Sequence, residues 1–184
     1  MHEKIRKIVK YFQHFADRFW YPPFIGFLAA LDNFVVVIPN DGILISNAML
    51  VPKRWLSLAF FVTVGSTLGA LLLAQFVDKF GIDLILDWYP SLIESQSWLL
   101  TKEFFERYGL YLVFFVALTP LAQQPAVILA ALVHTPIKDL LLVIFFGRLI
   151  KFMIMSYLGS HAPNLLKKLW GLKDELKDTG VIVE

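Results

Sequence analysis

Two acidic and two basic residues lie inside apolar stretches of this sequence, where a charge must have a partner or a task. Asp32 and Asp41 belong to the run 24–51, and Arg148 and Lys151 lie three positions apart in a later apolar run. Each cation costs on the order of 2.5–3.5 kcal/mol at the centre of an isolated membrane helix. We therefore expect these side chains to face the protein interior, a wet cavity or an anionic ligand.

The chemistry expected of this set is proton and anion binding. Asp32 and Asp41 are candidate proton carriers and the counter-charges of the two bases, while Arg148 and Lys151 are candidate ligands for an anionic head group. An ion-pair cluster that only locks the elements together explains the same residues, and both interpretations stay open. Neutral donors and acceptors, Gln123 and Gln124 among them, lie in a second break in the chain and are candidate lining residues of the same site.

No enzyme motif accompanies these residues. The chain has no cysteine and no HExxH, P-loop or CxxC pattern, and no nucleic-acid-binding pattern occurs. Asp32 and Asp41 lie on one broken stretch rather than on two facing helices, which argues against an aspartyl protease. We expect a protein that is not an enzyme and that needs neither a metal nor a cofactor.

Composition places the chain in a membrane. Hydrophobic residues make up 58% of the 184 positions, and the mean hydropathy is +0.65, whereas roughly 45–50% is usual in soluble domains. The net charge is only +2. The distribution of charge is therefore more informative than its sum, and we expect a single membrane domain.

Two apolar runs are each broken in the middle. The run 24–51 is interrupted at Pro39 and Gly42, and the run 109–134 at Pro120 and Pro125. Unbroken, the first run would form a helix of about 42 Å, but each of its arms reaches only about 20 Å, less than a hydrocarbon core of about 30 Å. Both runs are predicted to be re-entrant helical hairpins, whose irregular tips need protein or water around them.

Each broken run is followed by an unbroken one. The stretches 55–77 and 137–159 are long and apolar enough to span a bilayer. Small residues in them, Gly65, Gly69 and Gly147, are expected to let neighbouring helices approach closely. The two halves match in order, which predicts an inverted repeat with its site near the middle of the membrane.

The remaining segments are expected to lie at the membrane surface. They are the basic amphipathic segment 1–22, which Pro22 and Pro23 should end, the segment 80–107 and the basic tail 163–184. Most of the 17 Lys and Arg residues lie near the ends or in the Lys53–Arg54 turn, and four lie between positions 78 and 139. The positive-inside rule then predicts cytoplasmic termini in an inner membrane. The fold expected is an all-α integral membrane protein.

The order of weak motifs resembles the DedA superfamily, also called the VTT or SNARE-associated family, and most resembles its short YqaA-like branch. The resemblance rests on FFERYGLYLVFFVALTPLAQQP (104–125), HTPIKDLL (134–141) and GRLIKF (147–152), and it covers 23–159. It implies two inverted hairpins and lipid translocation, since bacterial members are linked to undecaprenyl phosphate recycling and proton-dependent homeostasis, and eukaryotic relatives to phospholipid scrambling.

The resemblance also implies roles for particular residues. Asp32 and Asp41 match the two acidic positions of the family's first hairpin, and Arg148 and Lys151 match a basic pattern of the branch. The two arginines that many bacterial members carry around the second hairpin are absent, since no Arg lies between Arg107 and Arg148. This departure favours a lipid other than undecaprenyl phosphate, or a scramblase.

The sequence is compatible with three functions. The first is a flippase or scramblase that moves an anionic lipid, undecaprenyl phosphate or a phospholipid, between leaflets, with protons as a further partner. The second is a proton- or ion-coupled transporter of a small solute, and the third is a membrane assembly factor whose charges only pack. The expected partners are membrane lipids and a second copy of the chain, and nucleic acid is not among them.

Overall fold

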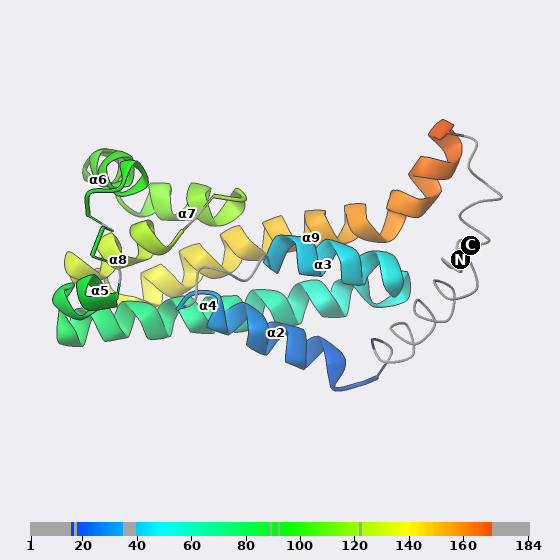
Figure 1. The fold of residues 1–184 in the computed structure, drawn as a ribbon, viewed down its shortest axis with the longest axis horizontal. Coiled ribbons are helices and arrows are strands. Elements are labelled where there is room, and N and C mark those ends of the chain that lie inside the picture. The colour runs from blue at the N-terminus through cyan, green and yellow to red at the C-terminus, as the bar shows by residue number, and fades with distance from the viewer. Residues whose placement is uncertain are drawn as a thin grey trace.

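Two long helices form the spine of the molecule. The structure, a computed structural model, describes residues 16, 18–34, 40–88, 90–91, 93–121 and 123–170, and within them it is helical without strands. α4 (Trp55–Phe80) and α9 (Ile137–Trp170) pack against one another, and run side by side through the centre of the ribbon (Figure 1). Two helical stretches are long and apolar enough to cross a membrane: Pro52–Phe80, which comprises α4 and the turn before it, and Ile137–Ala162 within α9.

The first hairpin packs against both long helices. Its arms are α2 (Tyr21–Leu31) and α3 (Asn40–Leu50), and a short 3-10 turn (Pro52–Arg54) then leads into α4. α2 lies on α4, whereas α3 lies on α9. The hydroxyl of Tyr21 donates to Oδ1 of Asn47 and so ties the outer ends of the two arms.

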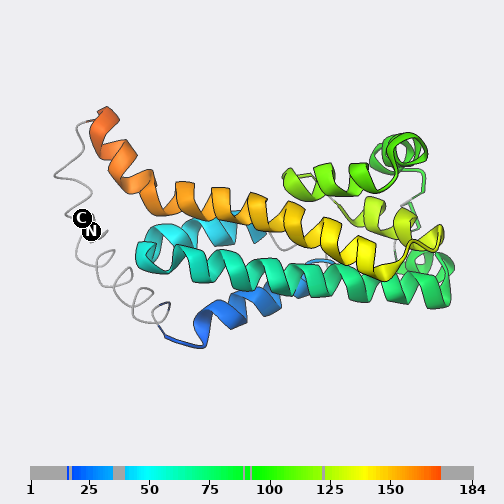
Figure 2. The same ribbon diagram turned by 180° about the vertical axis from the view of Figure 1, so that it is seen from behind.

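The second hairpin lies at the opposite end of the molecule (Figure 2). Its arms are α7 (Leu110–Leu118) and α8 (Gln124–Leu132). α7 packs on α9 and α8 packs on α4. The packing is therefore reciprocal, because the first arm of each hairpin lies on the long helix of its own half and the second arm lies on that of the other half.

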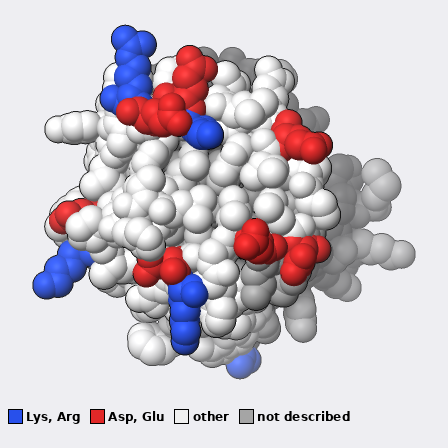
Figure 3. Space-filling model, turned by 90° about the vertical axis from the view of Figure 1, so that its left-hand side faces the viewer, with Lys and Arg blue, Asp and Glu red and all other residues white. Residues whose placement is uncertain are grey.

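Helices α5 (Asp83–Trp88) and α6 (Gln96–Tyr108) join the two halves. They belong to the segment for which short interfacial helices were expected. The Ser95 hydroxyl accepts from the backbone N–H of Trp98 and caps α6, and the Trp98 side chain is buried. The end face above these helices carries separate acidic and basic side chains around a mainly uncharged centre (Figure 3).

Glycines set the closeness of the helix contacts. A Cβ at Gly65 would lie 1.9 Å from the Gly26 carbonyl oxygen, and one at Gly69 would lie 2.3 Å from that of Ala30. On α9, a Cβ at Gly147 would lie 2.9 Å from the Cβ of Ala117 on α7. All three glycines that the sequence singled out thus lie at helix crossings where a side chain does not fit.

The structure differs from the sequence-based boundaries in several places. Pro22 does not end a helix but lies buried in the first turn of α2, where its missing N–H costs no hydrogen bond. Gly42 and Pro125 likewise lie in the first turns of α3 and α8 rather than in the breaks.

The second spanning segment was also predicted too short. α9 does not stop near position 159 but continues through Pro163 to Trp170, and its ribbon bends in that last part (Figure 2). Pro39, most of segment 1–22, and residues 171–184 lie outside the described residues.

Candidate functional site

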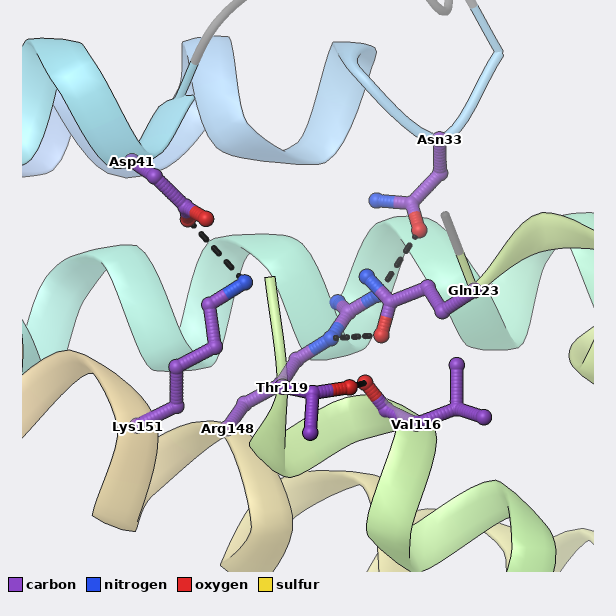
Figure 4. A network of polar contacts seen from close by, with 7 residues as sticks. All are labelled: Asn33, Asp41, Val116, Thr119, Gln123, Arg148 and Lys151. Atoms are coloured by element: carbon purple, nitrogen blue, oxygen red, sulfur yellow. Dashed lines mark hydrogen bonds and ion pairs between the residues drawn. The ribbon is translucent and has the colours of Figure 1, made fainter. Parts of the chain in front are cut away.

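Arg148 is the centre of the polar cluster. Arg148 is 0% exposed, although it lies in a mainly apolar stretch of α9. Its Nη2 donates to Oδ1 of Asn33 at 2.9 Å and its Nε donates to Oε1 of Gln123 at 3.0 Å. One guanidinium thus joins the end of α2 to the start of α8, as Figure 4 shows.

The third nitrogen of this guanidinium, Nη1, differs from the other two. Nη1 of Arg148 is buried and has no hydrogen-bond partner among the described residues. A buried N–H without a partner is costly, and more so when the group is charged. The hydroxyls of Ser66 and Thr67 on α4 are buried without a partner in the same sense, and Asn33 donates to the Ser66 carbonyl at 3.2 Å.

Lys151 lies one turn further along α9 and is paired differently. Its Nζ is 3.0 Å from Oδ1 of Asp41, with side-chain exposures of 10% and 31%. Asp41 lies in the first turn of α3, where the helix dipole favours a negative charge. The ion pair therefore fastens the second arm of the first hairpin to α9 (Figure 4).

Asp32 is close to this set without an ion pair of its own among the described contacts. It caps α2 at its C-terminal end and is partly buried, its side chain interacts with Asn40, and the charges of Arg148, Asp41 and Lys151 act on it. Its backbone carbonyl accepts a long bond of 3.4 Å from Nε2 of Gln124. The tips of the two hairpins therefore touch directly as well as through Arg148.

The structure brings all six predicted binding residues to one place, at the level where the hairpin tips meet α9. Two acids and two bases leave the cluster with no net formal charge. Thr119 is the C-cap of α7, and its hydroxyl donates to the Val116 carbonyl at 3.1 Å. It therefore satisfies its own helix end rather than the cluster.

Asn33 is the member that sequence reasoning missed. It is 4% exposed, and its Nδ2 donates to the carbonyls of Ala29, Ala30 and Ser66 at 3.2–3.3 Å. In the sequence, a neutral Asn next to the more conspicuous Asp32 looks like an ordinary polar residue at the end of a helix. The available signal was its polarity inside an apolar run, because a buried amide requires partners.

No group of metal-binding side chains occurs within the part of the chain that the structure describes. What the arrangement offers is a charged, buried donor with a free N–H, a second cation held by a carboxylate, and a nearby carboxylate in contact with Asn40. This is a set suited to an anion and to protons, surrounded by apolar helices.

Comparison with known proteins assigns most of the chain to one domain family. The family model of the VTT domain matches residues 38–161. An uncharacterized protein of Haemophilus influenzae is 21% identical over 158 residues, which cover 84% of this chain and 78% of that protein. An uncharacterized HI0703 homolog of Histophilus somni is 23% identical over 154 residues, with the same coverage. No solved structure matches the chain.

Proposed function

This chain belongs to the VTT-domain family of DedA-like membrane proteins, and from that premise we propose that it is a lipid translocase. It moves an anionic lipid between the leaflets of an inner membrane, with both termini on the cytoplasmic side. The observation that carries the proposal is the buried Arg148, whose Nη1 has no partner among the described residues. An anionic oxygen would complete its hydrogen bonds.

The proposed path runs between the hairpin tips. In a re-entrant arrangement both tips lie near mid-membrane, so that the polar groups that they enclose shorten the apolar distance that a head group must cross. Arg148 binds the phosphate, while the acyl chains stay among the exposed apolar side chains of the helices. Translocation of this kind involves no covalent chemistry and uses no cofactor.

Asp41 and Asp32 are the proposed proton sites. Asp41 holds Lys151 at 3.0 Å, and protonation of its carboxylate would remove the charge that holds this cation. Lys151 would then add to the positive charge around Arg148 and favour the bound anion. A proton taken up by Asp41 and a lipid bound at Arg148 would thus assist one another.

Reconstitution into liposomes tests this function. Fluorescent phosphatidylglycerol and a fluorescent polyprenyl phosphate are the probes, and access of a membrane-impermeant quencher measures their movement. We expect wild-type protein to move at least one probe and Asp41→Asn to abolish the movement. Asp83→Asn, which removes an exposed carboxylate from α5, is the matched control and should move lipid at the wild-type rate.

Two results would reject the proposal. Wild-type protein that is folded yet moves neither probe would favour a solute transporter or an assembly factor. Lipid movement that is the same in wild type, Asp41→Asn and Arg148→Gln would show that the cluster takes no part. The faster probe in the wild type identifies the substrate class.

A further inference from the structure

The two cations of α9 are held by different kinds of partner. Lys151 is held by the carboxylate of Asp41, whereas Arg148 is held by two amide oxygens, from Asn33 and Gln123. A carboxylate cancels the charge that it binds, but an amide oxygen accepts the same hydrogen bond without a charge of its own. The cluster therefore fixes the position of Arg148 without forming an ion pair to it.

We propose that Gln123 and Asn33 are the residues that make this site selective for an anion. They are positioning residues: they hold the guanidinium in place through neutral oxygens and so keep its charge and its Nη1 available for a lipid phosphate. The inference rests on the proposed lipid translocation and adds the determinant of its substrate class.

The orientation of Asn33 is fixed by its surroundings. Its Nδ2 faces three backbone carbonyls, those of Ala29, Ala30 and Ser66. Since a carbonyl cannot donate, these acceptors require the NH2 group on their side, and the Oδ1 atom then has to face Arg148. The amide cannot turn over without losing four hydrogen bonds, so Asn33 presents an acceptor to Arg148 in one orientation only.

Gln123 completes the hold from the other hairpin. It is the residue before the first turn of α8, and its Oε1 accepts from Nε on the inner edge of the guanidinium. Nε and one N–H of Nη2 are used in these bonds, and Nη1, which has no partner among the described residues, is left for a ligand. A ligand phosphate thus meets a guanidinium that is already oriented, which lowers the entropy lost on binding.

Gln123→Glu is the variant that separates positioning from charge. Glu has nearly the same shape, but its carboxylate would pair with Arg148 and cancel its charge. We expect this variant to keep or raise the wild-type melting temperature, because the hydrogen bond is retained and strengthened. We expect it to lose the preference for an anionic lipid.

The measurement is the ratio of two translocation rates in proteoliposomes, for fluorescent phosphatidylglycerol, which is anionic, and for fluorescent glucosylceramide, which has neither a phosphate nor a charge. In Gln123→Glu the ratio of the anionic to the uncharged probe should fall at least about tenfold. This is the effect expected when the charge-assisted hydrogen bond between Arg148 and the lipid phosphate is lost. Gln123→Leu, which removes the anchor without adding a charge, should slow both probes and change their ratio much less. Gln96→Glu, the same change at an exposed position of α6, should match the wild type.

The outcomes separate this inference from the function on which it rests. A wild-type ratio that Gln123→Glu leaves unchanged overturns the inference while lipid translocation stands. A Gln123→Glu protein with a clearly lowered melting temperature also overturns it, because the carboxylate would then not have paired with Arg148. Wild-type protein that moves neither probe rejects the proposed function, and this inference with it.

Discussion

Arg148 shows how a charge is kept inside an apolar helix bundle. Burial of a lone guanidinium is unfavourable by several kcal/mol even after relaxation, by order of magnitude. Asn33 and Gln123 supply hydrogen bonds but no counter-charge, and the nearby carboxylates act on Arg148 without a direct ion pair among the described contacts. The charge of Arg148 is therefore not balanced by a direct counter-ion among these contacts, and this is the argument for an anionic ligand.

The Asp41–Lys151 pair gives a prediction on stability. Asp41→Asn and Lys151→Met should each destabilise the protein by about 1–3 kcal/mol, between the values for exposed and fully buried pairs. The double variant should lose less than the sum, because neither charge is then left alone. Unfolding in detergent, followed through the fluorescence of the five tryptophans, measures all three. Additive losses would mean that the two side chains do not interact.

Asn33 gives a second prediction. Asn33→Ala leaves Nη2 of Arg148 without its acceptor and removes the side-chain donor to the carbonyls of Ala29, Ala30 and Ser66, and we expect a loss of about 2–3 kcal/mol in unfolding free energy. Ser91→Ala, at an exposed position outside the helices, should change it by less than about 0.5 kcal/mol. Equal stability of the two variants would contradict the buried hydrogen bonds.

The sequence predicts the charged members of the cluster better than the neutral ones. Asp41 and Lys151 are conspicuous because each is expensive in an apolar run, and opposite charges in that situation are expected to meet. Asn33 is neutral and so is less conspicuous in an apolar run. Its importance comes from its contacts with the Ser66 carbonyl of α4 and with the Arg148 side chain of α9. Such a role depends on tertiary contacts that local pattern does not contain.

At the scale of the elements, the second arm of each hairpin packs on the long helix of the other half. α3 of the first half packs on α9 of the second, and α8 of the second half packs on α4 of the first. This exchange supports the inverted repeat, which remains a prediction together with the re-entrant path of both hairpins. It also places the tip of each hairpin against the long helix of the opposite half.

The contact of α2 with α4 gives a prediction at this scale. Gly65→Ala should separate the two helices, because its Cβ would lie 1.9 Å from the Gly26 carbonyl oxygen, and we expect a loss of about 1–3 kcal/mol or more. Gly42→Ala, with nothing within 4 Å, should be neutral or stabilising by up to about 1 kcal/mol. Melting temperatures in detergent compare them, and similar values would argue against the close crossing.

Helix existence is predicted well by the sequence, and helix ends less well. The long apolar runs and proline breaks give the two hairpins and the two long helices in the right order. The errors concern prolines. Pro22 is expected to end a helix but lies in the first turn of one, where proline is favourable. The spanning stretch 137–159 and the tail from position 163 are expected to be separate, but α9 continues past Pro163 with a bend (Figure 2). Local pattern does not distinguish these uses.

At the scale of the whole molecule, the distribution of charge predicts the orientation. The end face that contains α5 and α6 carries both acidic and basic side chains (Figure 3). Because only four of the 17 Lys and Arg residues lie between positions 78 and 139, we expect this face to lie outward. The chain has no cysteine, so single cysteines report topology directly. Ser91→Cys should react with a membrane-impermeant maleimide added to intact cells, and Ser46→Cys on α3 with neither side.

This labelling has a clear contrary result. Reaction of Ser91→Cys only after the membrane is opened would reverse the orientation, and reaction of Ser46→Cys from one side would place α3 in water. Ser46 is exposed on the protein surface, so its protection would come from lipid and not from the fold.

The cluster also has a consequence for how the protein is made. Arg148 and Lys151 lie on the last long helix, while Asn33 and Asp41, which hold them, are synthesised more than a hundred residues earlier. Two such charges together disfavour insertion of α9 alone by about 5–7 kcal/mol at the centre of a bilayer. The first hairpin is therefore synthesised before α9 and provides partners for the two charges of that helix when it inserts. A separately expressed fragment beginning at residue 93 should insert poorly, and co-expression of residues 1–92 should restore it.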